Sequence, residues 1–286
     1  MRKIKRIAAL MTALMMISSA GCSSGSKDDS GSEKETAAQT GETAAADTEA
    51  EEPETKEPRS IKLMCMGDSI TDGFWLPGGY RITLEQLLKD NDLIEYVDFV
   101  GRKKVGDLDD NECEGYTGYA IDPASPADTI DGSRMGLSKM AGPALEANQP
   151  DVILLMIGTN DILSQYKLDE AGDRLGSLVD ICLDGLSEDG KLYVATIPVM
   201  DATDNTYIPA EYFTVETMDG FVADYNEKVK AVVEERANAG KSIELADVNS
   251  VLTKEDLYDG VHPNEEGYKK LGEFWYGIVS DHITNY

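Results

Sequence analysis

Residues 61–73 read IKLMCMGDSITDG, and this stretch decides the fold that the sequence predicts. The apolar run 61–66 is typical of a buried strand, and it stops at Gly67, where Asp68 and Ser69 follow. A serine at this point can cap the next helix, or it can be a nucleophile held at the edge of a sheet. Partners elsewhere in the chain must decide between the two roles.

Apolar runs and amphipathic segments alternate through the rest of residues 60–286. Strands are predicted at 61–66, 96–101, 151–158, 191–199 and 242–248. Helices are predicted at 80–90, 134–149, 169–186, 218–240 and 264–283. This alternation predicts a three-layer α/β/α sandwich with a five-stranded, mostly parallel sheet. In such sheets, ligands bind at the carboxyl ends of the strands.

Polar residues that can activate a serine follow three of the predicted strands. Ser69 follows the first strand, Asn160 the third, and Asp259 with His262 the fifth, so these loops should open on one edge of the sheet. His262 is the candidate base, and Asp259, three residues earlier, can orient its ring. His282 lies near the end of the last predicted helix, and we expect no catalytic role for it.

An ester carbonyl under attack develops an oxyanion, which needs hydrogen-bond donors held in place beforehand. The backbone N–H of Ser69, at the start of a helix, is one such donor. The segment GTND (158–161) offers the side-chain amide of Asn160, which donates without carrying a charge. The segment EGYTGYAID (114–122) offers the backbone N–H of Gly115 or Gly118.

The blocks GDSIT, GYTG, GTND and DGVHP, in this order, resemble the four blocks of the SGNH (GDSL-type) hydrolases. The resemblance covers residues 62–268 and implies a flavodoxin-like sandwich that hydrolyses esters through a serine and needs no cofactor. By this resemblance Ser69 is the nucleophile, and Asp259 and His262 complete the triad. The oxyanion hole would be formed by Ser69, Gly118 and Asn160.

The segments SITDGFWLPGGYR, VDFVGRK, EGYTGYAID and GTNDI resemble carbohydrate esterase family three, whose members remove acetyl groups from xylan. This resemblance implies an acetylated carbohydrate as the substrate. Five aromatic residues are expected near the rim of the site, where they could stack on sugar rings or simply pack: Trp75, Tyr80, Tyr116, Tyr119 and Tyr166.

Other functions remain open for the same sequence. A lysophospholipase, a thioesterase or a cell-wall O-acetyl esterase would share the fold and the chemistry and differ in the acyl group or its carrier. A non-catalytic sugar-binding lipoprotein would have kept the fold alone.

The amino-terminal fifth of the chain is predicted to direct export. Residues 1–21 combine a basic start with the apolar run 7–17, which is too short to span a bilayer and is typical of a lipoprotein-type signal peptide. SSAGC, ending at Cys22, resembles a lipobox, so Cys22 is the expected lipidation site and the only membrane attachment; ordinary secretion is the alternative. Residues 22–59 are predicted to be a disordered acidic linker before a catalytic domain at 60–286.

Composition excludes several other classes of function. A formal net charge of −28 argues against nucleic acid as a partner. With two histidines and no Cys/His cluster at zinc spacing, no metal centre is expected. Cys65 and Cys182 are expected to be packing residues, and a bridge between Cys65 and Cys113 is left open.

Overall fold

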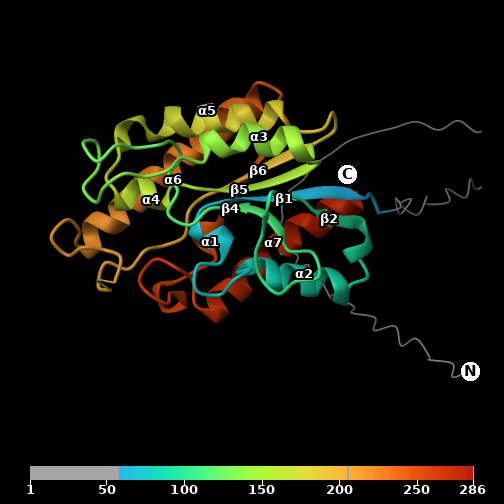
Figure 1. Ribbon diagram of the computed structural model, residues 1–286, viewed down its shortest axis with the longest axis horizontal. Coiled ribbons are helices and arrows are strands. Elements are labelled where there is room, and N and C mark those ends of the chain that lie inside the picture. Colours follow the sequence, from blue (N-terminus) through green and yellow to red (C-terminus); the bar gives the residue numbers. More distant parts are fainter. Residues whose placement is uncertain (1–57, 205, 286) are drawn as a thin grey trace, which may run out of the picture. The chain divides into compact units, whose positions relative to one another are not determined.

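Strand β1 (Ile61–Gly67) lies in the middle of a seven-stranded sheet in the computed structural model, which describes residues 58–204 and 206–285 (Figure 1). The other strands are β2 (Val97–Phe99), β3 (Lys103–Lys104), β4 (Glu112–Gly115), β5 (Val152–Met156), β6 (Lys191–Ala195) and β7 (Ile243–Ala246). The sheet runs in the order β3-β4-β1-β5-β6-β7, and β2 also pairs with β1. Every pairing is parallel except that of β3 with β4.

Helices cover both faces of this sheet. The α-helices are α1 (Ser69–Asp72), α2 (Tyr80–Asp90), α3 (Ser138–Asn148), α4 (Thr159–Leu163), α5 (Ala171–Asp184), α6 (Val215–Asn238) and α7 (Glu265–Asn285). Short 3-10 turns are η1 (Ile94–Tyr96), η2 (Leu168–Glu170), η3 (Val248–Ser250) and η4 (Lys254–Asp256). Figure 1 shows α3, α5 and α6 on one face, and α2 and α7 on the other.

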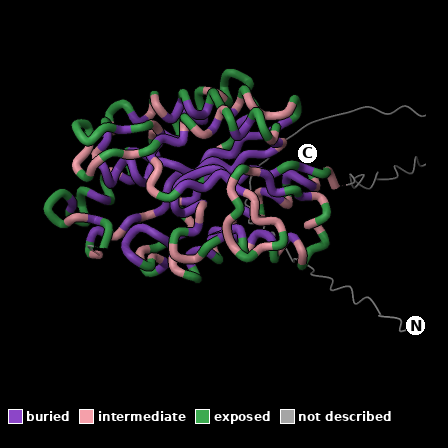
Figure 2. Tube along the Cα trace, viewed as in Figure 1, coloured by how far each residue is buried: buried purple, intermediate pink, exposed green. Residues whose placement is uncertain are grey.

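Alternating side chains of the strands supply the two cores. In β1, Met64 and Met66 join the cluster under α3, α5 and α6, whereas Leu63 and Cys65 join the cluster under α2 and α7. This period of two is that of a strand covered on both faces, and Figure 2 shows the sheet as the most continuously buried part of the chain. The central strands are therefore rigid supports for the loops at their ends.

The predicted α/β/α sandwich is confirmed, but the predicted number of five strands is wrong. The second predicted strand, 96–101, corresponds to β2, whereas β3 and β4 were not predicted. Strands β2 and β4 pair with opposite ends of the same edge of β1. The intervening residues leave the edge and return as an antiparallel hairpin through β3. Because β4 has only four residues, ECEG, and two of them are glutamates, no apolar run marks this strand in the sequence.

The helix predicted at residues 134–149 begins later than expected, at Ser138. Residues 134–136 instead pair with the loop after β4, through bridges between Ala124 and Arg134 and between Ala120 and Gly136. A side chain at position 136 would lie 2.2 Å from the backbone nitrogen of Pro123, so this close approach requires glycine. The segment before α3 thus belongs to the loops at the carboxyl edge.

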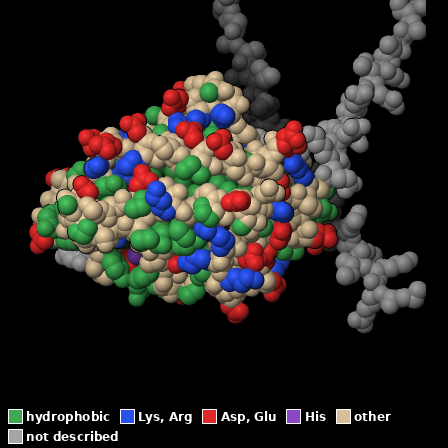
Figure 3. Space-filling view, turned by 45° about the horizontal axis from the view of Figure 1, so that its top comes forward, with side chains coloured by type: hydrophobic (Ala, Val, Ile, Leu, Met, Phe, Trp, Pro, Cys, Tyr) green, Lys and Arg blue, Asp and Glu red, His purple; other side chains and the backbone are tan. Residues whose placement is uncertain are grey.

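The predicted signal peptide (1–21), Cys22 and most of the predicted linker (22–59) lie outside the described residues. Cys65 and Cys113 are both buried free thiols, so the bridge left open by the sequence is not formed. No helix among the described residues is long and apolar enough to cross a membrane. On the face that Figure 3 shows, basic side chains are interspersed with acidic ones around hydrophobic patches.

Candidate active site

Ser69 is the first residue of α1, directly beyond the carboxyl end of β1. The carboxylate of Asp68 caps this short helix by accepting a 3.0 Å hydrogen bond from the backbone N–H of Ile70. Gly73 ends the helix in the left-handed conformation with φ of 81°. Because β1 lies between β4 and β5, the serine stands where the strand order reverses, the usual ligand site of such a sheet.

His262 reaches Ser69 from the loop between β7 and α7. Its Nε2 lies 2.9 Å from the Oγ of Ser69, and its Nδ1 lies 2.8 Å from Oδ2 of Asp259. All three side chains are buried, with 2–6% of each residue exposed. The structure therefore brings the three residues together in one hydrogen-bonded line, the arrangement in which a serine hydroxyl can lose its proton to an imidazole.

The backbone of the loop fixes Asp259 as well as His262. Oδ1 of Asp259 accepts hydrogen bonds from the backbone N–H groups of Val261 (3.1 Å) and His262 (2.7 Å). Burial acts to raise the pKa of Asp259, but the hydrogen bonds from His262 and Val261 outweigh it, and the pKa lies below its ordinary value. The carboxylate is thus held ionised beside Nδ1.

Two further contacts hold this loop in place. Gly260 has φ of 80°, and an added side chain there would lie 2.7 Å from the carbonyl oxygen of Asp201. Asn264 then caps α7, because its Oδ1 accepts from the backbone N–H of Gly267 at 3.0 Å. The conformation of the loop is therefore fixed on both sides of His262.

A pocket of about 180 Å³ opens on Ser69 and His262. Gly118 and Asn160, the predicted oxyanion donors, both line it. The remaining lining residues are Phe74, Thr117, Arg134, Leu163, Tyr207 and Val261. The segments that follow β1, β4, β5, β6 and β7 thus meet around one small space, as the candidate oxyanion hole requires.

Asn160 is held against the loop after β4. Its Nδ2 donates a 2.9 Å hydrogen bond to the carbonyl oxygen of Tyr119. The neighbouring Asp161, fully buried, accepts from the backbone N–H of Ile121 at 3.0 Å and pairs with Arg174. These links join the two segments that carry Gly118 and Asn160, so the candidate donors keep a fixed separation.

The two glycines that the sequence left as alternatives have different surroundings. Gly118 lines the pocket with φ of 79°, a conformation that favours glycine. Gly115 ends β4, and a side chain there would lie 2.5 Å from the backbone nitrogen of Asp72. Of the two, only Gly118 lines the pocket, whereas Gly115 allows β4 to pack against α1.

Phe74 and Tyr207 line the pocket although the sequence did not single them out. The Phe74 ring stacks on His262 with centroids 4.5 Å apart, and the edge of Tyr207 meets the same ring at 5.5 Å. Both remain exposed, at 39% and 44%. Phe74 comes directly after the GDSITDG stretch, so its place beside the site could have been inferred from the sequence. Tyr207 lies in a long segment without a motif, and no such signal marked it.

The aromatic residues expected at the rim mostly pack inside the protein. Tyr80 is fully buried against Trp275 in the core under α2 and α7, because β1 and α7 cover it completely. Tyr116 and Tyr166 are also buried. Trp75 is partly exposed and stacks on Tyr258 with centroids 4.6 Å apart. Of the two roles that the sequence left open for these residues, Tyr80, Tyr116 and Tyr166 therefore have packing and not stacking on sugar.

Asp68 is a buried acid directly beside the candidate nucleophile. Burial raises its pKa to about 6, because the hydrogen bond from Ile70 and the nearby His262 and Thr159 only partly offset the loss of hydration. The hydrogen bond from the Ile70 N–H explains why Asp68 stands at the start of α1. Because the carboxyl takes up a proton more readily in the folded state, the stability of the protein should depend on pH.

Elsewhere among the described residues, the second histidine and the largest hollow lie far from this arrangement in the fold. His282 is buried near the end of α7, with Nδ1 3.2 Å from the Tyr193 hydroxyl, and burial lowers its pKa. A larger hollow of about 780 Å³ lies at the amino ends of β1 and β5, where Asp151 accepts from the backbone N–H of Lys62 and the hydroxyl of Ser187. Within residues 58–204 and 206–285, no cluster of His, Cys, Asp and Glu could hold a metal ion.

Comparisons with known proteins agree with this geometry. The family model of GDSL-like lipases and acylhydrolases matches residues 63–275. A multidomain esterase of Ruminococcus flavefaciens is 34% identical over 238 residues, which are 78% of this chain and 29% of that protein. A putative endoglucanase X of Acetivibrio thermocellus is 27% identical over 156 residues, 54% of this chain and 60% of the relative. The chain thus spans less than two thirds of either relative.

A solved structure shares both the fold and part of the sequence. The family 3 carbohydrate esterase of Clostridium thermocellum has a TM-score of 0.59 and 28% identity, covering 79% of this chain and 98% of that one. The family match covers the α/β/α domain from within β1 to within α7, including Ser69, Asn160 and His262. The chain therefore belongs to the GDSL-like lipase/acylhydrolase family, and its matched domain is of the carboxylic ester hydrolase class.

Proposed function

We propose that the protein is a serine esterase that removes small acyl groups, chiefly acetyl, from carbohydrate such as acetylated xylan. The observation that carries this proposal is the hydrogen-bonded line from Asp259 through His262 to Ser69, beside a small pocket lined by Gly118 and Asn160. A serine cap of a helix would need none of these partners.

In the proposed reaction the Oγ of Ser69 attacks the ester carbonyl while Nε2 of His262 takes its proton. The carbonyl oxygen becomes an oxyanion, which the N–H groups of Ser69 and Gly118 and the amide of Asn160 stabilise. The carbon–oxygen bond to the sugar then breaks, and His262 returns the proton to the departing sugar oxygen. Water attacks the acyl-enzyme in the same way and releases the acid and free Ser69.

The size of the pocket favours a short acyl group. About 180 Å³ is well below the roughly 300–1,000 Å³ of pockets that hold drug-sized ligands. Leu163 and Val261 supply apolar walls near His262, suited to a methyl group. An acetyl group fits this space better than the long chain of a lysophospholipid.

The mouth of the pocket supports a carbohydrate as the carrier of the acyl group. Phe74 and Tyr207 expose aromatic rings beside His262, and such faces stack on the apolar faces of sugar rings. The likeness to a family 3 carbohydrate esterase, at 28% identity, points to the same class of substrate.

Export and anchoring belong to the same proposal, because a polysaccharide is met outside the cell. Residues 1–21 would act as the signal peptide, Cys22 would be lipidated, and residues 22–59 would tether the domain. In a bacterium with lipoprotein processing, the full chain should partition into detergent, and Cys22→Ala should move it to the aqueous phase. Equal partitioning of both would refute the anchor.

The decisive experiment for the substrate compares acetate release from acetylated xylan and O-acetylated peptidoglycan with fatty-acid release from lysophospholipid. We expect release from xylan, and a fall in kcat/KM along the p-nitrophenyl esters from acetyl to octanoyl. A rise with chain length, or release only from lysophospholipid, would contradict the proposed substrate. The Ser69→Ala variant, which should be inactive on every substrate, separates an error about the substrate from an error about catalysis.

A further inference from the structure

Arg134 extends its side chain to the boundary between the two loops that carry the candidate oxyanion donors. Its backbone is fixed by reciprocal 3.0 Å hydrogen bonds with Ala124, in the loop after β4. Its side chain is 21% exposed and lines the pocket that contains Ser69 and His262. None of the motifs of the sequence includes this arginine.

The guanidinium group contacts both donor-bearing segments. Its Nε donates to the Ser164 hydroxyl at 2.7 Å, at the end of α4. Its Nη1 lies 3.4 Å from the carbonyl oxygen of Gly118 and 3.4 Å from Oδ1 of Asn160. Its Nη2 pairs with the carboxylate of Asp131. One planar group thus spans the loop of Gly118 and helix α4.

These contacts determine which way the Asn160 amide faces. A guanidinium group has donors only, so Asn160 must turn its oxygen, and not its nitrogen, toward Arg134. Nδ2 then points to the other side, where one N–H donates to the Tyr119 carbonyl at 2.9 Å. The second N–H of Nδ2 is then available to donate to the reacting oxygen of the proposed ester hydrolysis. With the amide reversed, its oxygen would meet the oxyanion and repel it.

We propose that Arg134 is a positioning residue that fixes the Asn160 amide, together with the Gly118 loop, in the orientation that stabilises the oxyanion. Its charge is offset by Asp131, so it acts through geometry and not as a free cation near the substrate. This role rests on the proposed esterase function, since it presupposes that Asn160 is an oxyanion donor.

A double-mutant cycle tests this role. Hydrolysis of p-nitrophenyl acetate is measured for the wild type, Arg134→Gln, Asn160→Ala and the double variant of the full chain. Arg134→Gln should lower kcat about tenfold or more and leave KM within about twofold, because a displaced donor is lost mainly in the transition state. In the Asn160→Ala background the same change should cost at least threefold less, since the amide it positions is gone.

The outcomes separate the two proposals. A loss for Arg134→Gln that is as large in the Asn160→Ala background as in the wild type, or a loss below twofold in the wild type, would overturn the positioning role. No effect of Asn160→Ala would instead refute the proposed oxyanion donor itself. Arg134→Lys distinguishes charge from shape: a lysine cannot bridge the four partners of the guanidinium group in one plane, so it should not restore activity, and full restoration would overturn the role.

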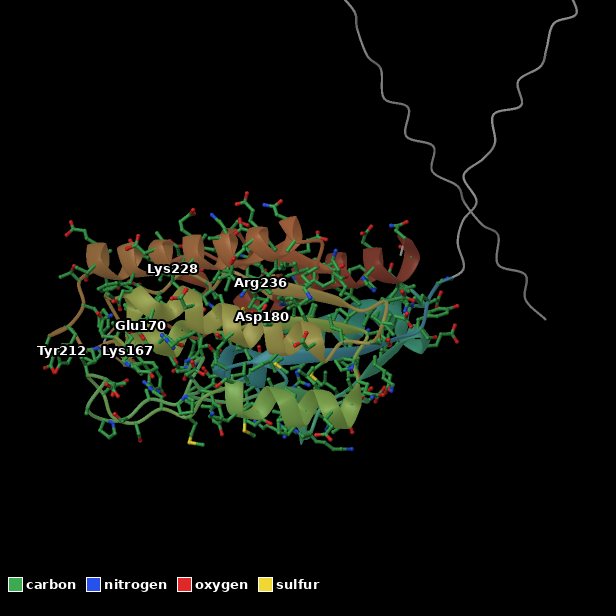
Figure 4. The ribbon with its side chains drawn as sticks, turned by 90° about the horizontal axis from the view of Figure 1, so that it is seen from above. Lys167, Glu170, Asp180, Tyr212, Lys228 and Arg236 are labelled. Atoms are coloured by element: carbon green, nitrogen blue, oxygen red, sulfur yellow. The ribbon has the colours of Figure 1, made fainter. Side chains whose placement is uncertain are left out.

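Arg236 provides a matched control for loss of a paired arginine. Arg236 belongs to α6, and its Nε and Nη2 donate to the two carboxylate oxygens of Asp180 in α5, at 2.8 and 3.0 Å. Figure 4 shows Arg236 and Asp180 beside each other on these helices. Arg236→Gln should leave kcat unchanged. The midpoints of thermal unfolding, measured for both arginine variants, should confirm that the assayed proteins are folded.

Discussion

The imidazole Nε2 of His262 lies 2.9 Å from the Oγ of Ser69, although 193 positions separate the two residues in the chain. The contact exists because both residues follow strands of one parallel sheet, β1 and β7, whose carboxyl ends meet at the same edge. The residues next to Ser69 and His262 in the sequence do not by themselves place these two side chains in contact. The fold therefore brings two segments that are far apart in the sequence into one hydrogen-bonded contact.

Asp259→Asn should lower kcat on the order of 10⁴-fold, because an amide cannot hold the imidazole in the required tautomer or stabilise its cation. The variant should fold, since its side-chain oxygen can still accept from the backbone N–H of His262, which lies 2.7 Å away in the wild type. Steady-state hydrolysis of p-nitrophenyl acetate measures the effect. Asp219→Asn, which removes an exposed partner of Lys254, is the control. Activity within tenfold of wild type would contradict the role of Asp259.

Asn160→Ala should reduce kcat by about 10² to 10³, the usual cost of one oxyanion donor. KM should change little, because the ground-state carbonyl oxygen lies short of the oxyanion position. A loss confined to KM would make Asn160 a substrate-binding residue instead. Asn148→Ala, which removes a side-chain bond within α3, serves as the control for loss of an amide.

Gly158→Ala should destabilise the protein by roughly 3 kcal/mol, through backbone strain and overpacking together. Gly158 has φ of 125°, and an added Cβ would lie 2.2 Å from the Tyr225 ring. Gly142→Ala, in α3, is the matched control, because its Cβ meets nothing within 4 Å and should be neutral or stabilising by up to about 1 kcal/mol. Urea unfolding measures both. Equal stabilities of the two variants would contradict the packing described here.

Asp68 should make the folded state less stable as pH rises from about 4 to 6. The pKa of its carboxyl is about 6 in the folded protein against an ordinary 3.8, so the folded state binds more protons in this window. Asp68→Asn removes the titration and keeps an acceptor for Ile70. The unfolding free energy of the variant relative to wild type should therefore rise by about 2 kcal/mol between pH 4 and pH 7. A difference that does not change with pH, or that changes no more than that of the exposed Asp98→Asn, would contradict this.

Much of the fold and the catalytic line could be predicted because the signals were local. Apolar runs of β1, β5 and β6 have the continuous pattern of strands covered on both faces, and Ser69 follows β1 and Asn160 follows β5. His262 follows β7, a shorter and less buried strand, and the DGVHP block marks it in the sequence. Parallel topology then required these loops to share an edge. The predicted positions needed no knowledge of side-chain contacts.

The remaining parts of the site depend on tertiary contacts that leave no periodic signal. Arg134 lies in a stretch that reads as the start of a helix, yet pairing with the loop after β4 competes with helix formation there. Tyr207 approaches His262 from the segment between β6 and α6, where no motif marks it. Tyr80 was expected at the rim, but its position in α2 turns it into the core beside Trp275.

Covalent labelling tests whether Ser69 is the residue that carries the acyl group. Phenylmethylsulfonyl fluoride should inactivate the enzyme with one adduct per chain, and mass spectrometry of the digested protein should place that adduct on Ser69. The protein with Ser69→Ala should take up no label. An adduct on another residue that abolishes activity, or full activity after stoichiometric labelling of Ser69, would contradict the account.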